Sequence, residues 1–376
     1  MKGLVNKIKM ALGYILYRCV FVYLPVNKNT VYFEAYWGKG YSCNPKAISQ
    51  YMSTHYPEKK QVWSFQNQGV NKNVNSTRQY SISYFYYLAT SQVFFVNANL
   101  PNFFRKRQGT VHIQTKHGTP LKIMGLDELE HKQLQHDIEF FEKRCKRWDY
   151  VISSNQYSSN IWKKAFPYSY ELIESGYPRN DSLIQYQNDQ VKIKAIREQL
   201  GINENCKVIL YMPTIRDYQT STSPYLDSVH LANELGDEYV ILSRFHYLTN
   251  DNFADVYPGN LIDVTEYSYV ENLYLVSDLL ITDYSSAMFD YSVLRKPILL
   301  YLFDYQEYKI NRGIYLDIIS SSPGEVFFDI NTLVGSLKSG NYLDALYEDK
   351  LKKFCQTYNA WEDGQASKKV CDVVFR

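Results

Sequence analysis

The sequence lacks the short motifs that identify several common enzyme classes. It contains no Walker A motif, no GxGxxG fingerprint and no HExxH motif. These absences argue against P-loop ATPases, NAD-dependent enzymes and zincin metalloproteases. The polar clusters described below also contain no Asp-x-Asp pair, so the sequence does not call for a dedicated divalent cation. We therefore predict neither a metal nor another cofactor.

The sequence also lacks closely spaced cysteines and a large net charge. The six cysteines are dispersed and no two lie at CxxC spacing, which is typical of reduced thiols and predicts no zinc site. The net charge is only +2, so no global field points to a nucleic acid partner. Hydrophobic residues make up 45% and charged residues 21%, as in globular proteins. A chain of 376 residues is long for a single core, so two domains are expected.

The N-terminal segment has no acidic residue through position 33, whereas it carries several basic ones. Residues 10–26 are mostly apolar but are interrupted by Arg18, so the run is too short and broken for a membrane-spanning helix. No small-residue cleavage site follows it, which argues against a secretory signal. Two interpretations stay open. Residues 1–30 are either a basic helix facing an anionic membrane surface or a first helix of the fold with solvated lysines.

Short apolar runs alternate with helical patterns in two successive series. The first series begins near Val31, the pattern pauses through Gln185–Gln199, and the second series begins near Val208. Each series is typical of an α/β unit, so we predict two Rossmann-like, doubly wound domains that face a central cleft. The domains are placed at residues 31–182 and 190–355, and residues 356–376 form a final helical segment.

The stretch Leu279–Pro297 organises the second series. Its apolar start, Leu279–Ile281, predicts a buried parallel strand. Asp283 is a candidate N-cap for the following helix, with Ser285 and Ser286 in the first turn. Such a helix start attracts phosphate, because free N–H groups and the helix dipole point at the anion. Taken alone, the stretch favours the plainer interpretation of an ordinary capped crossover helix.

Polar clusters follow the predicted strands at their carboxyl ends, where ligands bind in doubly wound sheets. The clusters are Lys116-His117, Arg179–Asp181, Arg216-Asp217, Arg244–His246 and Asp283–Ser286, with Arg312 later in the chain. Arginine binds phosphate oxygens in a bidentate manner, and histidine exchanges protons near neutral pH. His117 lies beside Gly118 at a strand-to-loop break, whereas His112 lies within an apolar strand and is predicted to pack in the core. This inventory suits phosphoryl or glycosyl transfer from an activated, phosphate-linked donor.

Six motifs in one order carry a resemblance to a known family. They are KHGTPLK (116–122), SGYPRND (175–181), YMPTIRD (211–217), SRFHY (243–247), ITDYSSAMFDY (281–291) and NRGIYLD (311–317). Together they resemble the CDP-glycerol glycerophosphotransferase family, which includes the teichoic acid primases and polymerases of Gram-positive bacteria. The segment 33–48 resembles the opening of the family domain. One departure is Ile215, where the family often carries tryptophan.

The resemblance implies a GT-B fold in which the final helix, within residues 356–376, crosses back to the first domain. It also implies a peripheral enzyme at the cytoplasmic face of the cell membrane, which favours a membrane-surface helix for residues 1–30. The donor would be CDP-glycerol or, less often, CDP-ribitol, and the acceptor a polyprenyl-diphosphate-linked glycan or growing chain. Attack on the β-phosphorus would release CMP. The alternative is a GT-B glycosyltransferase that uses a nucleotide sugar, and homo-oligomerisation is left open.

The resemblance also suggests roles for individual residues. His117 would be the general base, and His246 would neutralise or protonate the leaving phosphate. Ser285 and Ser286, after Asp283, would hold the donor pyrophosphate, and Arg312 would clamp it. Donor contacts near the cytidine are further assigned to Pro213, Thr214 and Arg216, and Arg244 is counted with them. The remaining candidates are Lys116, Gly118, Thr119, Arg179, Asn180 and Asp181, of which the last two could face donor or acceptor.

Overall fold

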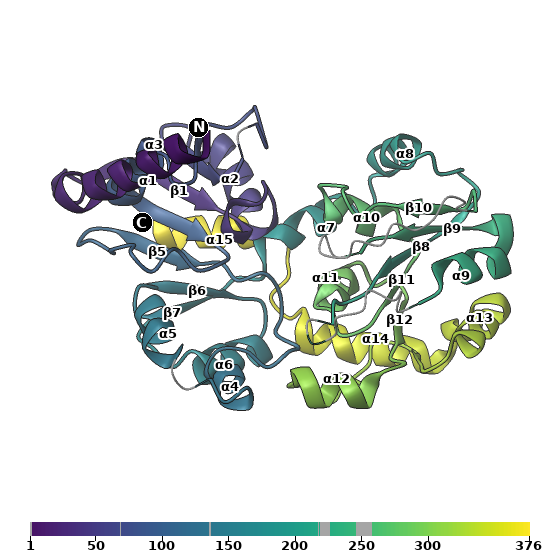
Figure 1. The fold of residues 1–376 in the computed structure, drawn as a ribbon. Coiled ribbons are helices and arrows are strands. Elements are labelled where there is room, and N and C mark those ends of the chain that lie inside the picture. The colour runs from purple at the N-terminus through teal and green to yellow at the C-terminus, as the bar shows by residue number, and fades with distance from the viewer. Residues whose placement is uncertain (1, 68, 135–136, 217, 219–225, 246–257) are drawn as a thin grey trace.

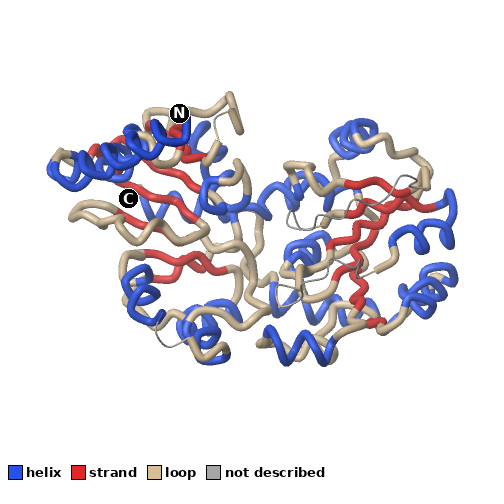
Figure 2. Tube along the Cα trace, viewed as in Figure 1, coloured by secondary structure: helices blue, strands red, loops and turns tan. Residues whose placement is uncertain are grey.

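The chain folds into two α/β domains, which lie next to one another in Figure 1. The computed structural model describes residues 2–67, 69–134, 137–216, 218, 226–245 and 258–376. Each domain contains one parallel sheet, drawn as a group of red strands in Figure 2, with helices packed around it. The prediction of two parallel-sheet α/β domains is confirmed.

The N-terminal sheet has the order β3-β2-β1-β4-β5-β6-β7, and its paired strands run parallel within the described residues. In domain numbering this order begins 3-2-1-4, which is the arrangement of a doubly wound sheet. Aromatic rings stack across its centre, because Phe33 lies 5.3 Å from both Trp63 and Phe95 between ring centroids. The strands are β1 (Asn27–Glu34), β2 (Lys60–Phe65), β3 (Ser76–Arg78), β4 (Ser91–Val96), β5 (Val111–Gln114), β6 (Tyr150–Ser153) and β7 (Glu171–Glu174).

Helices cover this sheet, and the first of them is the N-terminal segment. Helix α1 packs on α3, where the Gly13 backbone approaches the Phe85 ring. Tyr17 is fully buried, and its hydroxyl accepts a hydrogen bond from the Arg105 backbone N–H at 2.8 Å. One face of α1 is therefore part of the fold. The helices are α1 (Lys2–Cys19), α2 (Cys43–His55), α3 (Ile82–Thr90), α4 (Leu126–His131), α5 (Ile138–Cys145) and α6 (Gln156–Ala165).

The C-terminal sheet has the order β10-β9-β8-β11-β12-β13 in the described part of the chain. This is 3-2-1-4-5-6 in domain numbering, the strand order of dinucleotide-binding folds. Its strands are β8 (Lys207–Met212), β9 (Tyr239–Ser243), β10 (Leu261–Asp263), β11 (Leu279–Thr282), β12 (Ile298–Tyr301) and β13 (Val326–Phe327). Its helices are α7 (Asp181–Tyr186), α8 (Gln190–Gln199), α9 (Ser228–Leu235), α10 (Val270–Val276), α11 (Ala287–Tyr291), α12 (Tyr305–Arg312), α13 (Ile330–Ser339) and α14 (Ala345–Tyr358).

Strand β11 lies at the centre of the second sheet, between β8 and β12. Leu280 packs into the core on one face, whereas Leu279 and Ile281 pack into the core on the other. A strand buried on both faces requires an uninterrupted apolar run, which explains its sequence. The expected helix after it is much shorter, since α11 begins at Ala287 and gives way to a 3₁₀ turn at Ser292. The prediction that Asp283 caps this helix is wrong, for the reason given below.

Two further expectations can be checked in the first domain. His112 is buried, and burial lowers the pKa of its imidazole to about 3, so the prediction of a packed core histidine is confirmed. The polar helical pattern from Leu129 to Lys146 predicts a single long helix, whereas the structure has two separate helices, α4 and α5, over this stretch. In the described residues, no helix is long and apolar enough to cross a membrane.

The last helix, α15 (Ala366–Val374), returns to the first domain. It packs against α2, and Figure 1 shows it in yellow beside the N-terminal sheet, whereas α14 lies in the second domain. The Asp181 carboxylate holds the start of α15 by accepting hydrogen bonds from the backbone N–H groups of Ala366 at 2.9 Å and Ser367 at 2.8 Å. Asp181 thus joins the two segments that cross between the domains.

We predict that Asp181→Ala destabilises the protein by about 1–2 kcal/mol, because two N–H groups at the start of α15 lose their acceptor. The shift of the urea unfolding midpoint measures this effect. The matched control is Asp372→Ala, which removes a carboxylate from the same helix where it pairs with Lys368 at an exposed position. That variant should change stability by less than about 1 kcal/mol. Equal shifts for the two variants would contradict the role given to Asp181.

Candidate functional site at the domain junction

The loop after β5 meets the turn after β11 at Gly118. This glycine has a φ of 132°, and a Cβ atom there would lie 2.7 Å from Arg179 Nη2 and 3.0 Å from Ser286 Oγ. Neither distance leaves room for a side chain, so glycine is required for this contact. The structure thereby brings Gly118, which directly follows His117 in the first domain, next to Ser286 of the second. The sequence predicted that these motifs form one site, and their contact supports that prediction.

His117 is held in one orientation by its neighbours. Its Nδ1 lies 3.2 Å from the carbonyl oxygen of Asn97, and its ring lies 5.7 Å from the Tyr36 ring between centroids. Since a carbonyl can only accept, the neutral ring carries its proton on Nδ1 and leaves Nε2 as an acceptor. Asn97 also fixes Tyr36, because its Oδ1 accepts from the Tyr36 backbone N–H at 2.7 Å.

The surroundings of His117 keep its imidazole neutral. The residue is exposed to solvent, and the Asn97 carbonyl and the Tyr36 ring are its neighbours on the protein side. Desolvation lowers its pKa to about 4, and the nearby cations Arg179, Lys116 and Lys122 add to this effect. At neutral pH the ring is therefore unprotonated, with a free Nε2. This is the state that a general base requires.

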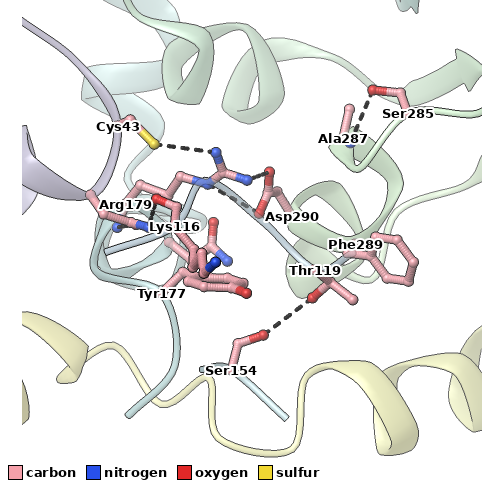
Figure 3. A network of polar contacts seen from close by, with 12 residues as sticks. Cys43, Lys116, Thr119, Ser154, Tyr177, Arg179, Ser285, Ala287, Phe289 and Asp290 are labelled. Carbon is pink, nitrogen blue, oxygen red and sulfur yellow. Dashed lines mark hydrogen bonds and ion pairs between the residues drawn. The ribbon is translucent and has the colours of Figure 1, made fainter. Parts of the chain in front are cut away.

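Arg179 connects the two domains at this point, as Figure 3 shows. Its Nη2 lies 2.5 Å from Asp290 Oδ2, its Nε donates to Oδ1 at 3.3 Å, and its Nη1 contacts the Cys43 sulfur at 3.4 Å. Both charged side chains are more than nine-tenths buried. Arg179 was predicted as a cation for phosphate, whereas the structure gives it a carboxylate partner on α11.

Two side chains near Arg179 support the same loop. Asn44, at the start of α2, donates to the backbone oxygens of Thr115 at 2.8 Å and Lys116 at 3.1 Å. Its Oδ1 accepts from the Arg179 backbone N–H at 3.1 Å. Asn180 donates from Nδ2 to Glu362 at 3.0 Å, on the segment that leads to α15. Asn180 and Asp181 therefore contact the chain's return to the first domain.

Arg216 lies at the centre of a buried ionic cluster, and its side chain has no exposed surface. Its Nη1 lies 2.7 Å from Asp283 Oδ2, and its Nε and Nη2 bind Asp304 at 2.8 and 2.9 Å. The other Asp283 oxygen accepts from the Thr214 backbone N–H at 2.8 Å. This explains why Asp283 does not cap α11, since both of its oxygens bind the loop after β8. Asp304 follows β12, so the cluster joins three strand ends.

The remaining predicted arginines also have partners. Arg244 donates to the backbone oxygens of Val264 at 2.9 Å and Tyr267 at 2.6 Å. Arg312 pairs with Glu128 of the first domain at 3.1 Å. The backbone around Arg312 also crosses the junction, because Ile123 and Gly313 share a hydrogen bond of 3.2 Å. In this structure the NRGIYLD motif joins the two domains.

Other predicted residues are placed as follows. Thr119 is buried and lies 3.3 Å from the Ser154 hydroxyl, as Figure 3 shows. Lys116 points into an aromatic cluster, which differs from the predicted role as a phosphate-facing cation. The Ser285 hydroxyl accepts from the Ala287 backbone N–H at 3.2 Å. Pro213 and Thr214 follow β8, and the Thr214 hydroxyl is buried without a hydrogen-bond partner in the described structure.

His246 lies outside the described residues, so its predicted role stays a prediction.

The structure adds three residues to the site that the sequence did not indicate, namely Asn44, Asn97 and Asp290. Asp290 lies inside the ITDYSSAMFDY motif and Asn44 inside the segment 33–48, but the sequence shows no partner for either. Within the described ranges, no group of three or more His, Cys, Asp or Glu side chains could hold a metal ion.

We predict that Arg216→Met destabilises the protein by about 3–5 kcal/mol, because two buried carboxylates would lose their partner. The midpoint of thermal or urea unfolding measures the change. The control is Lys338→Met, which removes one partner of an exposed pair with Glu234 and should change stability by less than about 1 kcal/mol. If Arg216→Met unfolds at the wild-type midpoint, the cluster does not have the structural role described here.

Comparison with known proteins places this geometry in a family. The model of the CDP-Glycerol:Poly(glycerophosphate) glycerophosphotransferase family matches residues 15–376. The teichoic acid glycerol-phosphate transferase of Staphylococcus aureus is 36% identical over 368 residues, which cover 93% of this chain and 94% of that protein. The teichoic acid poly(glycerol phosphate) polymerase of Bacillus subtilis is 37% identical over 94% of this chain, which spans about half (49%) of that polymerase.

A solved structure agrees with the sequence matches. The structure of the wall teichoic acid polymerase TagF is similar with a TM-score of 0.88 and 33% identity, covering 100% of this chain and 96% of that one. A related structure is a histidine-to-asparagine variant of TagF soaked with CDPG, with a TM-score of 0.89. The likeness extends over both domains, so it includes the junction where Gly118 meets Ser286. This chain belongs to the CDP-glycerol:poly(glycerophosphate) glycerophosphotransferase family.

Proposed function

We propose that this chain transfers glycerol phosphate from CDP-glycerol to a hydroxyl of a growing teichoic acid chain or of a polyprenyl-diphosphate-linked glycan, and releases CMP. The family membership supports the reaction class. The observation that carries the proposal is the contact of Gly118 with Ser286, because it joins the loop that carries the neutral His117 to a hydroxyl of the second domain. CDP-ribitol is a second donor of the same chemistry.

In the proposed reaction, Nε2 of His117 takes the proton of the acceptor hydroxyl. The hydroxyl oxygen then bonds to the β-phosphorus of the donor, and the bond from that phosphorus to the bridging oxygen breaks. The bridging oxygen leaves with the electron pair as part of CMP, and the proton stays on the imidazole until solvent removes it. A positioned general base contributes about 10²- to 10⁴-fold to the rate of such a step.

The second domain would hold the donor. The hydroxyls of Ser285 and Ser286 stand at the start of α11 and would donate to the pyrophosphate. Thr214 would contact the nucleoside end, because its buried hydroxyl has no hydrogen-bond partner in the described part of the chain. Arg312 would contact the donor only by sharing its charge with Glu128, and His246 would act on the leaving phosphate.

The first domain would face the acceptor and the membrane. On α1, Leu12 and Ile15 are exposed on the side away from Gly13 and Tyr17, which pack on α3, and Arg18 is exposed one turn after Ile15. Apolar side chains flanked by basic ones bind the surface of an anionic bilayer. We therefore propose a peripheral enzyme at the cytoplasmic face of the membrane, where a polyprenyl-linked acceptor is anchored.

The donor preference tests the proposed function. CMP release is measured with CDP-glycerol, CDP-ribitol and a UDP-sugar, using a synthetic lipid-linked disaccharide as the acceptor. We expect turnover with a CDP-alditol, and mass spectrometry of the product gives the number of units added. Turnover of the UDP-sugar alone would establish the glycosyltransferase alternative and reject the proposal.

In the same assay, His117→Ala should lower kcat by about 10²- to 10⁴-fold, because the acceptor hydroxyl loses its general base. Near wild-type turnover would remove His117 from the role of base.

The membrane assignment is tested on the intact chain, because deleting the N-terminal segment would also remove the buried Tyr17. The double variant Leu12→Glu, Ile15→Glu should weaken sedimentation with anionic vesicles by about ten- to hundredfold, since two apolar side chains no longer enter the bilayer. Val191→Glu, at an exposed position on α8, is the matched control and should bind like wild type. Unchanged binding of the double variant would refute this surface.

A further inference from the structure

Lys116, which directly precedes His117, has its ammonium group inside an aromatic cage. Its Nζ lies 3.4 Å from the centroid of the Phe166 ring, 4.4 Å from that of Trp162 and 4.5 Å from that of Trp148. The residue is 7% exposed. The rings belong to α6 and to the segments next to α6 and β6, so the side chain is fixed to the body of the first domain.

The cage contains no anion for this cation. The described residues include no carboxylate that forms an ion pair with Lys116, and the nearby Cys145 thiol is uncharged because burial raises its pKa to about 12. Burial also lowers the pKa of Lys116 to about 7. A buried cation without a counterion is costly, and attraction to ring faces offsets about 0.5–2 kcal/mol of that cost. An apolar side chain would suit the fold better, which suggests that the charge serves another purpose.

The backbone at Lys116 is also in an unfavourable conformation. Its φ is 53°, which a residue with a Cβ adopts only at a cost of about 1–2 kcal/mol. The conformation is held by Asn44, which donates to the Lys116 carbonyl at 3.1 Å, and by the side chain of Gln114, which accepts from the Lys116 N–H at 3.1 Å. As a result, two consecutive side chains have different surroundings. Lys116 contacts the cage, and His117 contacts Tyr36 and Asn97.

We infer that Lys116 is a positioning residue, whose caged ammonium anchors the strained turn that presents His117 and whose positive charge disfavours protonation of that imidazole. The inference rests on the proposed role of His117. Lys116 is charged throughout the acidic range where His117 titrates, so the two cations repel one another there. The other charged groups near His117 are Arg179 and Lys122, and both act in the same direction. Removal of the Lys116 charge should therefore raise the pKa of His117.

Two substitutions separate the anchoring effect of the Lys116 side chain from the effect of its positive charge. Lys116→Gly keeps a residue that tolerates the positive φ but removes the anchor, so His117 should lose its fixed position. We expect kcat to fall by about ten- to a hundredfold while KM for CDP-glycerol stays within about twofold, because the donor contacts lie in the other domain. Lys116→Met keeps an apolar side chain in the cage and removes only the charge, so the protein should fold at or above the wild-type unfolding midpoint.

The effect of the Lys116 charge on the His117 pKa is measured without an activity assay. The imidazole resonances of histidine-labelled protein are titrated by NMR in the wild type and in Lys116→Met, with His117→Asn used to assign the His117 signal. The His117 pKa should rise above about 4 in Lys116→Met but stay below its ordinary value, because desolvation and Arg179 still act on the ring. Lys163→Met, which removes an exposed lysine from the surface cavity beside Phe166, should leave the titration and kcat unchanged.

The outcomes distinguish this inference from the proposed function. If His117→Asn is as active as wild type, His117 is not the base and the proposed mechanism fails, whatever Lys116 does. If His117→Asn is inactive but Lys116→Gly has a wild-type kcat, the anchoring role is wrong and the mechanism stands. An unchanged His117 titration in Lys116→Met overturns the electrostatic part. A fall in kcat for Lys116→Gly together with the predicted rise in the His117 pKa for Lys116→Met supports the inference.

Discussion

The buried ion pair between Arg179 and Asp290 is the interaction on which the geometry of the site depends. It joins the end of the first domain to α11 of the second, and the Gly118 backbone packs directly against the Arg179 guanidinium. Loss of either partner would leave a buried charge without compensation, which costs about 3–5 kcal/mol. The same cost opposes any separation of the domains at this point. The approach of Gly118 to Ser286 is therefore set by electrostatics as well as by packing.

Ionic pairing also determines how the cations at the junction can interact with a negatively charged donor. Arg179, Arg216 and Arg312 each face a carboxylate, and Lys116 faces aromatic rings. The described part of the junction thus offers hydroxyls and backbone N–H groups in addition to shared cations. Dipoles that are already oriented stabilise a developing negative charge without reorganising during the reaction. A pyrophosphate donor could bind such a surface without the strong ground-state attraction that a cluster of free arginines would produce.

The fold was predictable from local patterns, because a strand buried on both faces, such as Leu279–Ile281, requires a continuous apolar run. The grouping of polar motifs followed from the rule that ligands bind at the carboxyl ends of parallel strands. Side-chain partners were not predictable in this way. Asp290 lies 111 residues from Arg179, and the local pattern at Asp283 predicts a helix cap because its partner, Arg216, is 67 residues away. Which carboxylate meets which cation depends on how the domains pack, and no periodicity encodes that.

The chain passes between the domains twice, and the two passages are bonded to one another. Glu362 accepts from the Tyr177 backbone N–H and from Asn180, and Asp181 binds the first N–H groups of α15. Two adjacent connections that are hydrogen-bonded to one another restrict twisting and sliding of one domain against the other, which a single flexible linker would permit. The remaining motion of the domains is rotation about one axis near these connections, and the displacement of a residue grows with its distance from that axis. Groups close to that axis, such as Arg179, would hardly move, whereas the far edges of the two sheets would travel most.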